Sequence, residues 1–398
     1  MILKSAAPAY GGYTIAREEK IILIRGAIPG EVVETVIEEN RRDYAVASVT
    51  QVVEPSEHRI EPQCPVFGSC GGCHLQFMTY DRQVTLKEEV LLDSLSRQGG
   101  IEMPLSPSFR SEPWRYRLRS QFKVSKEGEI GFYRESSRDV VSFDECPLLH
   151  DGINSLFRKI RETGVPSGVT GIHVAGSDRP LVMVRSREKA PGYADRLLEM
   201  GAAGVAWNDE LAAGDAETEL DLGGLRYTVS PWTFFQAHWE LNRRVVEFAV
   251  SQLQPLDGKS VLDLYAGAGN FSLPIASQGA AVTAVEEHPA AVEDGMRNAQ
   301  MNAIRNCRFK KSTAEKFPLA KKYDIIVLDP PRPGLTNEVR KKLLDRPPDT
   351  ILYLSCNPAT LARDLKVLSA TYVVESVRMV DFFPQTYHLE ALAVLRAR

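Results

Sequence analysis

The second half of the chain alternates short apolar runs with helical stretches, and this pattern constrains the fold more than any other feature. From about residue 240, five runs typical of strands read SVLDL, AVTAVE, CRFKKS, YDIIVLD and TILYLS. Helical stretches such as PAAVEDGMRNAQMNA and PATLARDLKVL separate most of them. This alternation predicts an α/β fold with a parallel, doubly wound sheet. The closing segments YVVESVRMVD and LEALAVLRAR predict a final antiparallel strand.

The chain of 398 residues is long enough for two or three domains. Residues 1–56 alternate with the period of a strand between Gly-rich and Pro-Gly turns, which predicts a small OB-like β-barrel. Residues 57–230 mix strands and helices and predict a central α+β domain. Residues 231–398 then form the doubly wound domain.

The composition is that of a soluble globular protein. The chain has no run of about 18 apolar residues, and its first residues lack the apolar core of a signal peptide. We therefore expect a cytoplasmic protein without a membrane partner, and we expect it to be a monomer.

The net charge of −4 gives no global sign of nucleic-acid binding, but the charge is uneven. Residues 109–138 carry eight Lys or Arg against four Asp or Glu, with aromatic residues among them. Basic residues that alternate with aromatic ones suit phosphate contacts and base stacking. The alternative is a β-hairpin with a solvated charged face, which the segment favours when taken alone.

A cofactor loop is predicted where the first strand of the α/β pattern ends, in DLYAGAGNF. Gly267 and Gly269 allow a sharp turn at the carboxyl edge of the sheet, where such folds bind ligands. Glu286 ends the next strand, where a carboxylate can accept hydrogen bonds from both ribose hydroxyls. Ser272 stands where a dinucleotide fingerprint has its third glycine. The pattern favours S-adenosylmethionine over NAD.

Two further strands of this pattern end in reactive side chains. Asp329 is the first residue of DPPRPG, at the end of the fourth strand. Arg332 stands where amino-methyltransferases of DNA commonly have an aromatic residue. An exocyclic amine is therefore not the expected target of methylation. Cys356 ends the fifth strand, where a thiol beside a methyl donor suggests nucleophilic catalysis at C6 of a uracil. Glu390 is a candidate base for the proton at C5. On spacing alone, an ordinary strand carboxylate is the favoured interpretation of Glu390, and Cys356 could be a small buried residue.

Four of the six cysteines form a separate pattern: Cys64, Cys70 and Cys73 have the spacing C-x5-C-x2-C, and Cys146 follows later. Four thiolates can hold a [4Fe–4S] cluster or zinc. CGGCH also matches a haem attachment pattern, which normally requires export.

Taken together, DLYAGAGNF, DPPRPGL, LSCNPATLARDL and DFFPQTYHLE resemble the RNA 5-methyluridine methyltransferases, closest to the branch that acts on 23S rRNA. SPWTFFQAH, the cysteine pattern and the N-terminal barrel, which resembles a TRAM domain, extend the resemblance over nearly the whole chain. His238 stands where the family usually has Asn.

The resemblance implies a class I, Rossmann-like methyltransferase domain, with Cys356 as nucleophile and Glu390 as base. It implies cofactor-site residues for S-adenosylmethionine, namely Gln236, Tyr265, Asn270, Glu286 and Asp329. It also favours a [4Fe–4S] cluster on the four cysteines over zinc, and ribosomal RNA over tRNA as substrate.

Two rival functions belong to other classes. An iron–sulfur oxidoreductase would use the α/β domain for a dinucleotide, but the missing third glycine and the presence of both Cys356 and Glu390 argue against it. A catalytically silent RNA-binding protein would need neither of these two residues. Because a base inside a helix must be flipped out before it can react, we expect an unstacked or loop uridine as the target.

Overall fold

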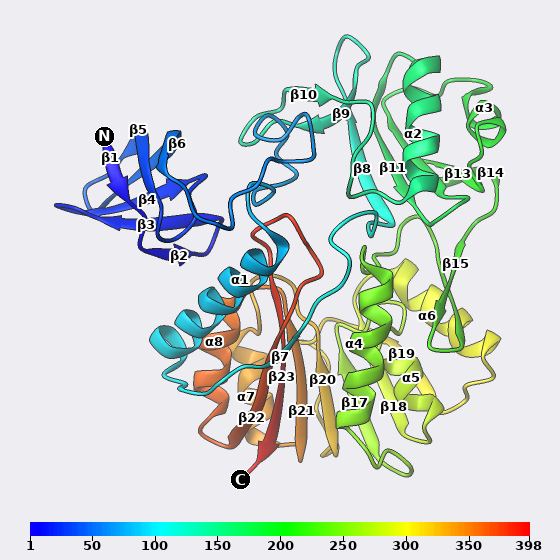
Figure 1. Ribbon diagram of the computed structural model, residues 1–398. Helices are drawn as coiled ribbons and strands as arrows, with labels where there is room; N and C mark the ends of the chain where they lie inside the picture. Colours follow the sequence, from blue (N-terminus) through cyan, green and yellow to red (C-terminus); the bar gives the residue numbers. More distant parts are fainter.

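The computed structural model describes residues 1–398 in three parts: an N-terminal barrel, a central α/β layer and a larger C-terminal layer (Figure 1). The C-terminal part is built on a sheet of eight strands. In spatial order they are β19 (Cys307–Lys311), β18 (Ala281–Glu286), β17 (Ser260–Leu264), β20 (Ile325–Leu328), β21 (Thr350–Ser355), β23 (Glu390–Ala397), β22 (Tyr372–Val380) and β7 (Ser106–Phe109).

The pairing of these strands confirms the doubly wound fold. Neighbouring strands run parallel except β23, which is antiparallel to both β21 and β22, as the sequence predicts for the last strand. One face of the sheet shares a hydrophobic core with α4 (Trp239–Gln252), α5 (Ser272–Ser277) and α6 (Pro289–Met301). The other face shares a core with α1 (Tyr80–Ser94), α7 (Asn337–Asp345) and α8 (Pro358–Leu368).

Two segments from before residue 230 pack on this C-terminal sheet. Helix α1 contributes Leu86, Val90 and Leu91 to the core beneath α8, continues through one π turn (Leu95–Gly99) and ends at Gly100. β7 then extends the sheet beside β22. On the other face, the hairpin of β15 (Thr218–Leu222) and β16 (Leu225–Val229) packs with α4. The boundaries at residues 56 and 230 stay predictions, but the core around the sheet is not continuous in sequence.

The central part is a sheet of seven strands covered by α2 (Asp151–Thr163) and α3 (Tyr193–Glu199). Its strands, in spatial order, are β10 (Val140–Ser142), β9 (Ile130–Tyr133), β8 (Arg119–Val124), β11 (Val169–Ala175), β12 (Leu181–Ser186), β13 (Gly204–Trp207) and β14 (Glu210–Gly214). Phe122, Phe143 and Phe157 stack within its core, with ring centroids 4.5 Å and 4.8 Å apart in the two closest pairs. Helix α2 therefore buries its apolar stripe against aromatic side chains of the sheet.

The N-terminal sheet closes on itself. Its strands are β1 (Ile2–Lys4), β2 (Ala7–Ala9), β3 (Tyr13–Arg17), β4 (Ile21–Arg25), β5 (Val32–Asn40) and β6 (Tyr44–Glu54), in the order β1-β5-β6-β4-β3-β2. Because only two residues separate β1 from β2, one continuous segment pairs with both β5 and β3 and joins the two edges. The predicted small barrel follows from this closure. None of the helices combines the length and the apolar character needed to cross a membrane.

Candidate active site

The loop after β17 has the tight backbone that the sequence predicts. Gly269 has φ +97°, and a Cβ there would lie 2.8 Å from Leu273 Cγ and 3.0 Å from Phe309 Cζ, so only glycine fits. Asn270, the next residue, exchanges two side-chain hydrogen bonds of 2.8 and 3.0 Å with Asn242 of α4. The loop is thus held from both sides before α5 begins.

Glu286, at the end of β18, fixes the same loop through hydrogen bonds to backbone N–H groups. Its Oε2 accepts a hydrogen bond of 2.9 Å from the backbone N–H of Gly267, and its Oε1 accepts one of 2.8 Å from that of His288. Gln236 Oε1, one of the buried acceptors without a partner, lines the same cleft as Gly267 and Glu286. Unpaired buried acceptors are costly, and a ligand with amino and hydroxyl donors would satisfy them. The donor and acceptor set therefore fits S-adenosylmethionine.

Cys356 lies at the tip of β21 because the next two residues start a helix. Asn357 is the N-cap of α8, and its Oδ1 accepts hydrogen bonds from the N–H groups of Ala359 and Thr360 at 3.0 and 3.4 Å. Pro358 occupies the first turn, where its missing N–H costs nothing. The pair Asn-Pro therefore ends the strand and leaves the thiol at the strand–helix junction.

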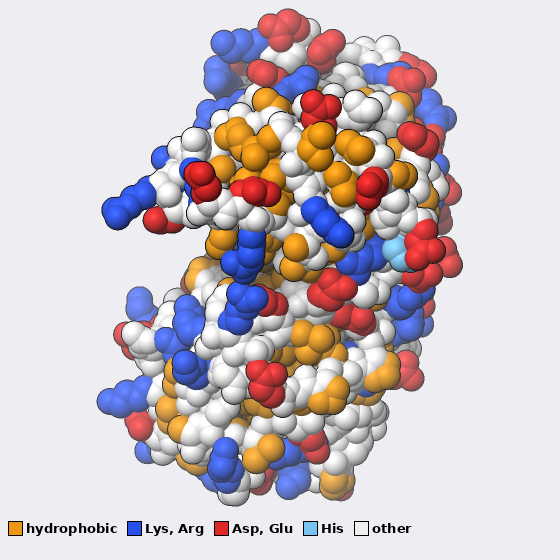
Figure 2. Space-filling model, turned by 60° about the vertical axis from the view of Figure 1, so that its left-hand side comes forward, with side chains coloured by type: hydrophobic (Ala, Val, Ile, Leu, Met, Phe, Trp, Pro, Cys, Tyr) orange, Lys and Arg blue, Asp and Glu red, His pale blue; other side chains and the backbone are white.

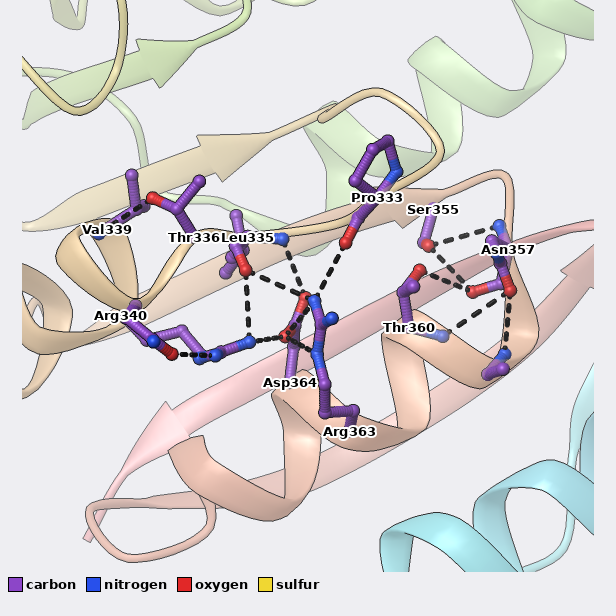
Figure 3. A network of polar contacts seen from close by, with 12 residues as sticks. Pro333, Leu335, Thr336, Val339, Arg340, Ser355, Asn357, Thr360, Arg363 and Asp364 are labelled. Carbon is purple, nitrogen blue, oxygen red and sulfur yellow. Dashed lines mark hydrogen bonds and ion pairs between the residues drawn. The ribbon is translucent and has the colours of Figure 1, made fainter.

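Helix α8 also holds the loop that follows Asp329 (Figure 3). Asp364, which is fully buried, accepts hydrogen bonds of 2.8 Å from both Leu335 N–H and Tyr353 O–H. Arg363 donates to the Pro333 carbonyl at 2.9 Å, and Thr360 donates to the Arg332 carbonyl at 3.3 Å. The loop after β20 and the thiol after β21 are thereby fixed to one helix.

Three ionisable groups of the site carry shifted pKa values. Burial raises the pKa of Cys356 to about 12, and Glu390 and Asp329 add to that shift. Burial also raises the pKa of Asp329 to about 7, helped by Asp263 and Glu286. The pKa of Glu390 lies well above its ordinary value, because this carboxyl is buried and faces Asp329. In the free site the thiol is therefore protonated near neutral pH, while the carboxyl groups are stronger bases than usual.

All seven predicted catalytic and cofactor residues line one cleft of about 800 Å³, namely Gln236, Tyr265, Asn270, Glu286, Asp329, Cys356 and Glu390. Parallel strands end at the same edge of a sheet, which explains how residues from such distant segments meet. Their chemical roles stay predictions.

His238, at the position where the resemblance expects Asn, is the N-cap of α4. Its Nδ1 accepts a hydrogen bond from Leu241 N–H at 3.4 Å, and its ring stacks on Tyr116.

The cleft also contains residues to which the sequence assigns no role. Phe234 is 63% exposed, and the Arg119 guanidinium lies 5.1 Å from its ring centroid. His388 lines the cleft near Arg332, with 3.5 Å between its Nδ1 and Arg332 Nη2. Both residues belong to the quoted motifs SPWTFFQAH and DFFPQTYHLE, but no spacing rule points to either of them.

The four clustered cysteines meet at a second, much smaller cavity of about 30 Å³ with mostly apolar walls. Burial raises the pKa of Cys73 to about 12 and that of Cys146 to about 11, and nearby thiol groups push in the same direction. Such a cavity disfavours several thiolates unless a positive charge compensates them. No group of three or more His, Cys, Asp or Glu side chains stands in metal-ligating geometry. The chemistry of the donor set nevertheless suits a metal centre.

The basic segment 109–138 does not offer all of its aromatic rings for base stacking. Tyr116 and Phe122 are buried, Tyr116 donating its hydroxyl to the Pro384 carbonyl at 3.1 Å, so neither is free to stack on a base. Arg110 and Arg115 form ion pairs with acidic residues, whereas Arg134 and Arg138 are exposed and unpaired. Lys and Arg side chains lie on both sides of a surface indentation on the barrel side of the molecule (Figure 2).

Comparison with known proteins places this site in a class. Residues 217–398 match the model of the tRNA (uracil-5-)-methyltransferase family. The chain is 36% identical to a 23S rRNA (uracil(1939)-C(5))-methyltransferase RlmD of Alkalilimnicola ehrlichii, over 95% of this chain and 92% of that one. It is 34% identical to an uncharacterized RNA methyltransferase of Aquifex aeolicus, over 98% of this chain and 96% of that one.

A solved structure shares the whole fold. The tRNA (uracil-54, C5)-methyltransferase of Pyrococcus abyssi, in complex with S-adenosyl-L-homocysteine, superposes with a TM-score of 0.79 at 23% identity and covers 99% of this chain and 100% of that one. With these relatives, the chain belongs to the family of S-adenosylmethionine-dependent RNA (uracil-C5) methyltransferases. The predicted fold class and enzyme class are confirmed, and the rival oxidoreductase has no support.

Proposed function

We propose that this chain methylates C5 of a uridine in 23S rRNA, with Cys356 as nucleophile and Glu390 as base. The observation that carries the proposal is the single cleft in which the thiol, two carboxyl groups of raised pKa and the cofactor loop come together. Relatives of near full-length coverage are named for uridine 1939 of 23S rRNA. A tRNA uridine is the second candidate, because the matching family model carries a tRNA description.

In the proposed reaction, Cys356 gives its thiol proton to a cleft carboxylate such as Asp329 as Sγ bonds to C6 of the uracil, and the electrons of the C5–C6 double bond move onto C5 and O4. S-adenosylmethionine supplies the methyl group that C5 accepts, and Gln236, Tyr265, Asn270, Glu286 and Asp329 would hold this donor. Glu390 then removes the C5 proton. The electrons of that C–H bond restore the double bond and expel Cys356 as its S–C6 bond breaks.

The shifted pKa values support this division of roles. Because the pKa of Cys356 is raised to about 12, the thiol gives up its proton only as it attacks, and it needs a nearby acceptor. Burial raises the pKa of Asp329 to about 7, so this carboxyl can take the thiol proton, and the raised pKa of Glu390 makes its carboxylate a stronger base for the C5 proton.

The small cysteine-lined cavity supports a [4Fe–4S] cluster on Cys64, Cys70, Cys73 and Cys146. The cluster would join residues 64–76, whose His74 and Leu75 N–H groups donate to the Gln385 carbonyl, to the segment around Cys146. We propose a structural role for it. We propose that the N-terminal barrel is a TRAM domain that binds RNA. We also propose that the enzyme is cytoplasmic and monomeric.

The deciding experiment is mass spectrometry of RNase-mapped ribosomal and transfer RNA from a strain that lacks the gene. Loss of one 5-methyluridine from 23S rRNA, restored by the wild-type gene and not by Cys356→Ala, is the expected result. Loss from tRNA alone would select the second candidate. Unchanged 5-methyluridine in both RNA classes would reject uridine methylation as the function in the cell.

A further inference from the structure

The N-terminal barrel reaches the catalytic cleft through the turn between β2 and β3. At Gly12, with φ +82°, a Cβ would lie 3.4 Å from Tyr387 Cβ and 3.6 Å from His74 Cβ, so the barrel backbone approaches the loop before Glu390 closely. Tyr10 adds an edge-to-face contact with Tyr387, with ring centroids 5.7 Å apart and an interplanar angle of 84°.

From Tyr387 the aromatic contacts continue into the cleft. The Tyr387 ring lies 4.2 Å from the ring of His388, which lines the cleft together with Arg332, Cys356 and Glu390. The edge of Tyr387 is also covered by His74, at 4.6 Å. A continuous row of rings therefore connects the barrel to the reacting centre.

Tyr10 is the exposed end of this row. Its side chain keeps 38% of its surface accessible although Tyr387 covers one edge. The ring contacts Tyr387, which directly precedes the cleft residue His388, so Tyr10 lies on the side of the barrel that approaches the cleft. A partly exposed aromatic ring beside a site that takes an unstacked base can stack on a second base.

We propose that Tyr10 is a stacking site for the unpaired base next to the target uridine, and that it couples RNA held by the barrel to the chemistry at Cys356. This inference rests on the proposed function. A uridine that leaves its stack to enter the cleft also leaves a neighbour without a partner, and stacking of that neighbour on an aromatic side chain offsets part of the unfavourable unstacking. The ligand class is a nucleobase of single-stranded RNA, without a preference for one sequence.

The test uses a short single-stranded RNA that contains one uridine flanked on its 5′ or its 3′ side by 2-aminopurine, whose fluorescence falls on stacking. We expect quenching on one side with the wild-type protein and with Tyr10→Phe, and its loss with Tyr10→Ala. Affinity for the RNA should fall about 5- to 100-fold in Tyr10→Ala, as expected for loss of one stacked base. The affinity of Tyr10→Ala for S-adenosylmethionine should stay unchanged, which would show that the variant is folded.

Tyr44→Ala is the matched control, because Tyr44 is also a barrel tyrosine that is 38% exposed and makes no aromatic contact with the loop before Glu390. Equal losses in Tyr10→Ala and Tyr44→Ala, or no loss in Tyr10→Ala, would overturn the stacking site. Methyl transfer by the wild-type protein to the same RNA, followed with a labelled donor, separates this failure from failure of the proposed function.

Discussion

Lys87 Nζ lies 2.7 Å from Asp381 Oδ1, and both side chains are fully buried although 294 residues separate them in the chain. Lys87 also donates to the Phe383 carbonyl at 3.0 Å. One helical turn earlier, Gln83 exchanges two hydrogen bonds of 2.9 Å with Gln385. One face of α1 therefore fixes the loop 381–389, which leads directly into Glu390.

Lys87→Met should lower the free energy of unfolding by about 3–5 kcal/mol, because it leaves a buried carboxylate without its partner. The double variant Lys87→Met/Asp381→Leu should recover most of this loss, because it removes both charges. Urea unfolding followed by circular dichroism measures both. Arg97→Ala, which breaks the exposed pair with Asp93, is the control and should cost less than about 1 kcal/mol. A double variant as unstable as the single one would contradict this account.

Glu390→Gln should stop the reaction after methyl transfer, because an amide of nearly the same shape cannot accept the C5 proton. The expected product is an RNA–protein adduct that survives denaturation and carries label from the methyl donor. Cys356→Ala should give neither adduct nor methylated RNA. Both are read on a denaturing gel with labelled donor. Wild-type turnover by Glu390→Gln without an adduct would place the base elsewhere in the cleft.

Alkylation of Cys356 should be slow at pH 8 and should rise about tenfold for each pH unit up to pH 10, because only the thiolate reacts and its pKa is raised to about 12. Glu390→Gln should speed the reaction at each pH, since this carboxylate contributes to the raised pKa. Iodoacetamide labelling of the Cys356 peptide, followed by mass spectrometry, measures the rate. A rate that levels off between pH 9 and 10 would instead show an ordinary thiol, whose pKa is 9.0.

The stability of the protein should fall as the pH rises from about 4 to 7, partly because of Asp263. Burial raises the pKa of this carboxyl from 3.8 to about 7, so the folded chain binds more protons than the unfolded chain within that range. Asp263→Asn should therefore weaken the pH dependence of the melting temperature between pH 4 and 7. An identical pH dependence in both proteins would show that Asp263 is ionised in the fold.

Protein purified without oxygen should contain about four iron atoms per chain, the content of one cubane held by four thiolates. Cys146→Ser should lower the iron content and the visible absorption, whereas Cys307→Ser, on β19 outside the small cavity, should leave both unchanged. Stoichiometric zinc without iron would replace the cluster by a zinc site.

Local patterns in the sequence determined the doubly wound sheet, its final antiparallel strand and the positions of Gly269, Glu286, Asp329 and Cys356. Each of these depends on neighbours in the chain: alternation defines a strand, glycine permits the turn, and Asn-Pro ends β21 and starts α8. Because parallel strands end at one edge of a sheet, the order of the motifs also brought the cleft residues together.

Only the tertiary structure decided how the remaining segments join this site. No local pattern places α1 on the C-terminal sheet, pairs Lys87 with Asp381 or brings Tyr10 to Tyr387. These contacts link segments far apart in the chain, and their formation depends on how whole domains pack and on which polar groups remain buried together. The cleft residues are therefore placed by local sequence patterns, and the packed fold determines which residues hold them in position.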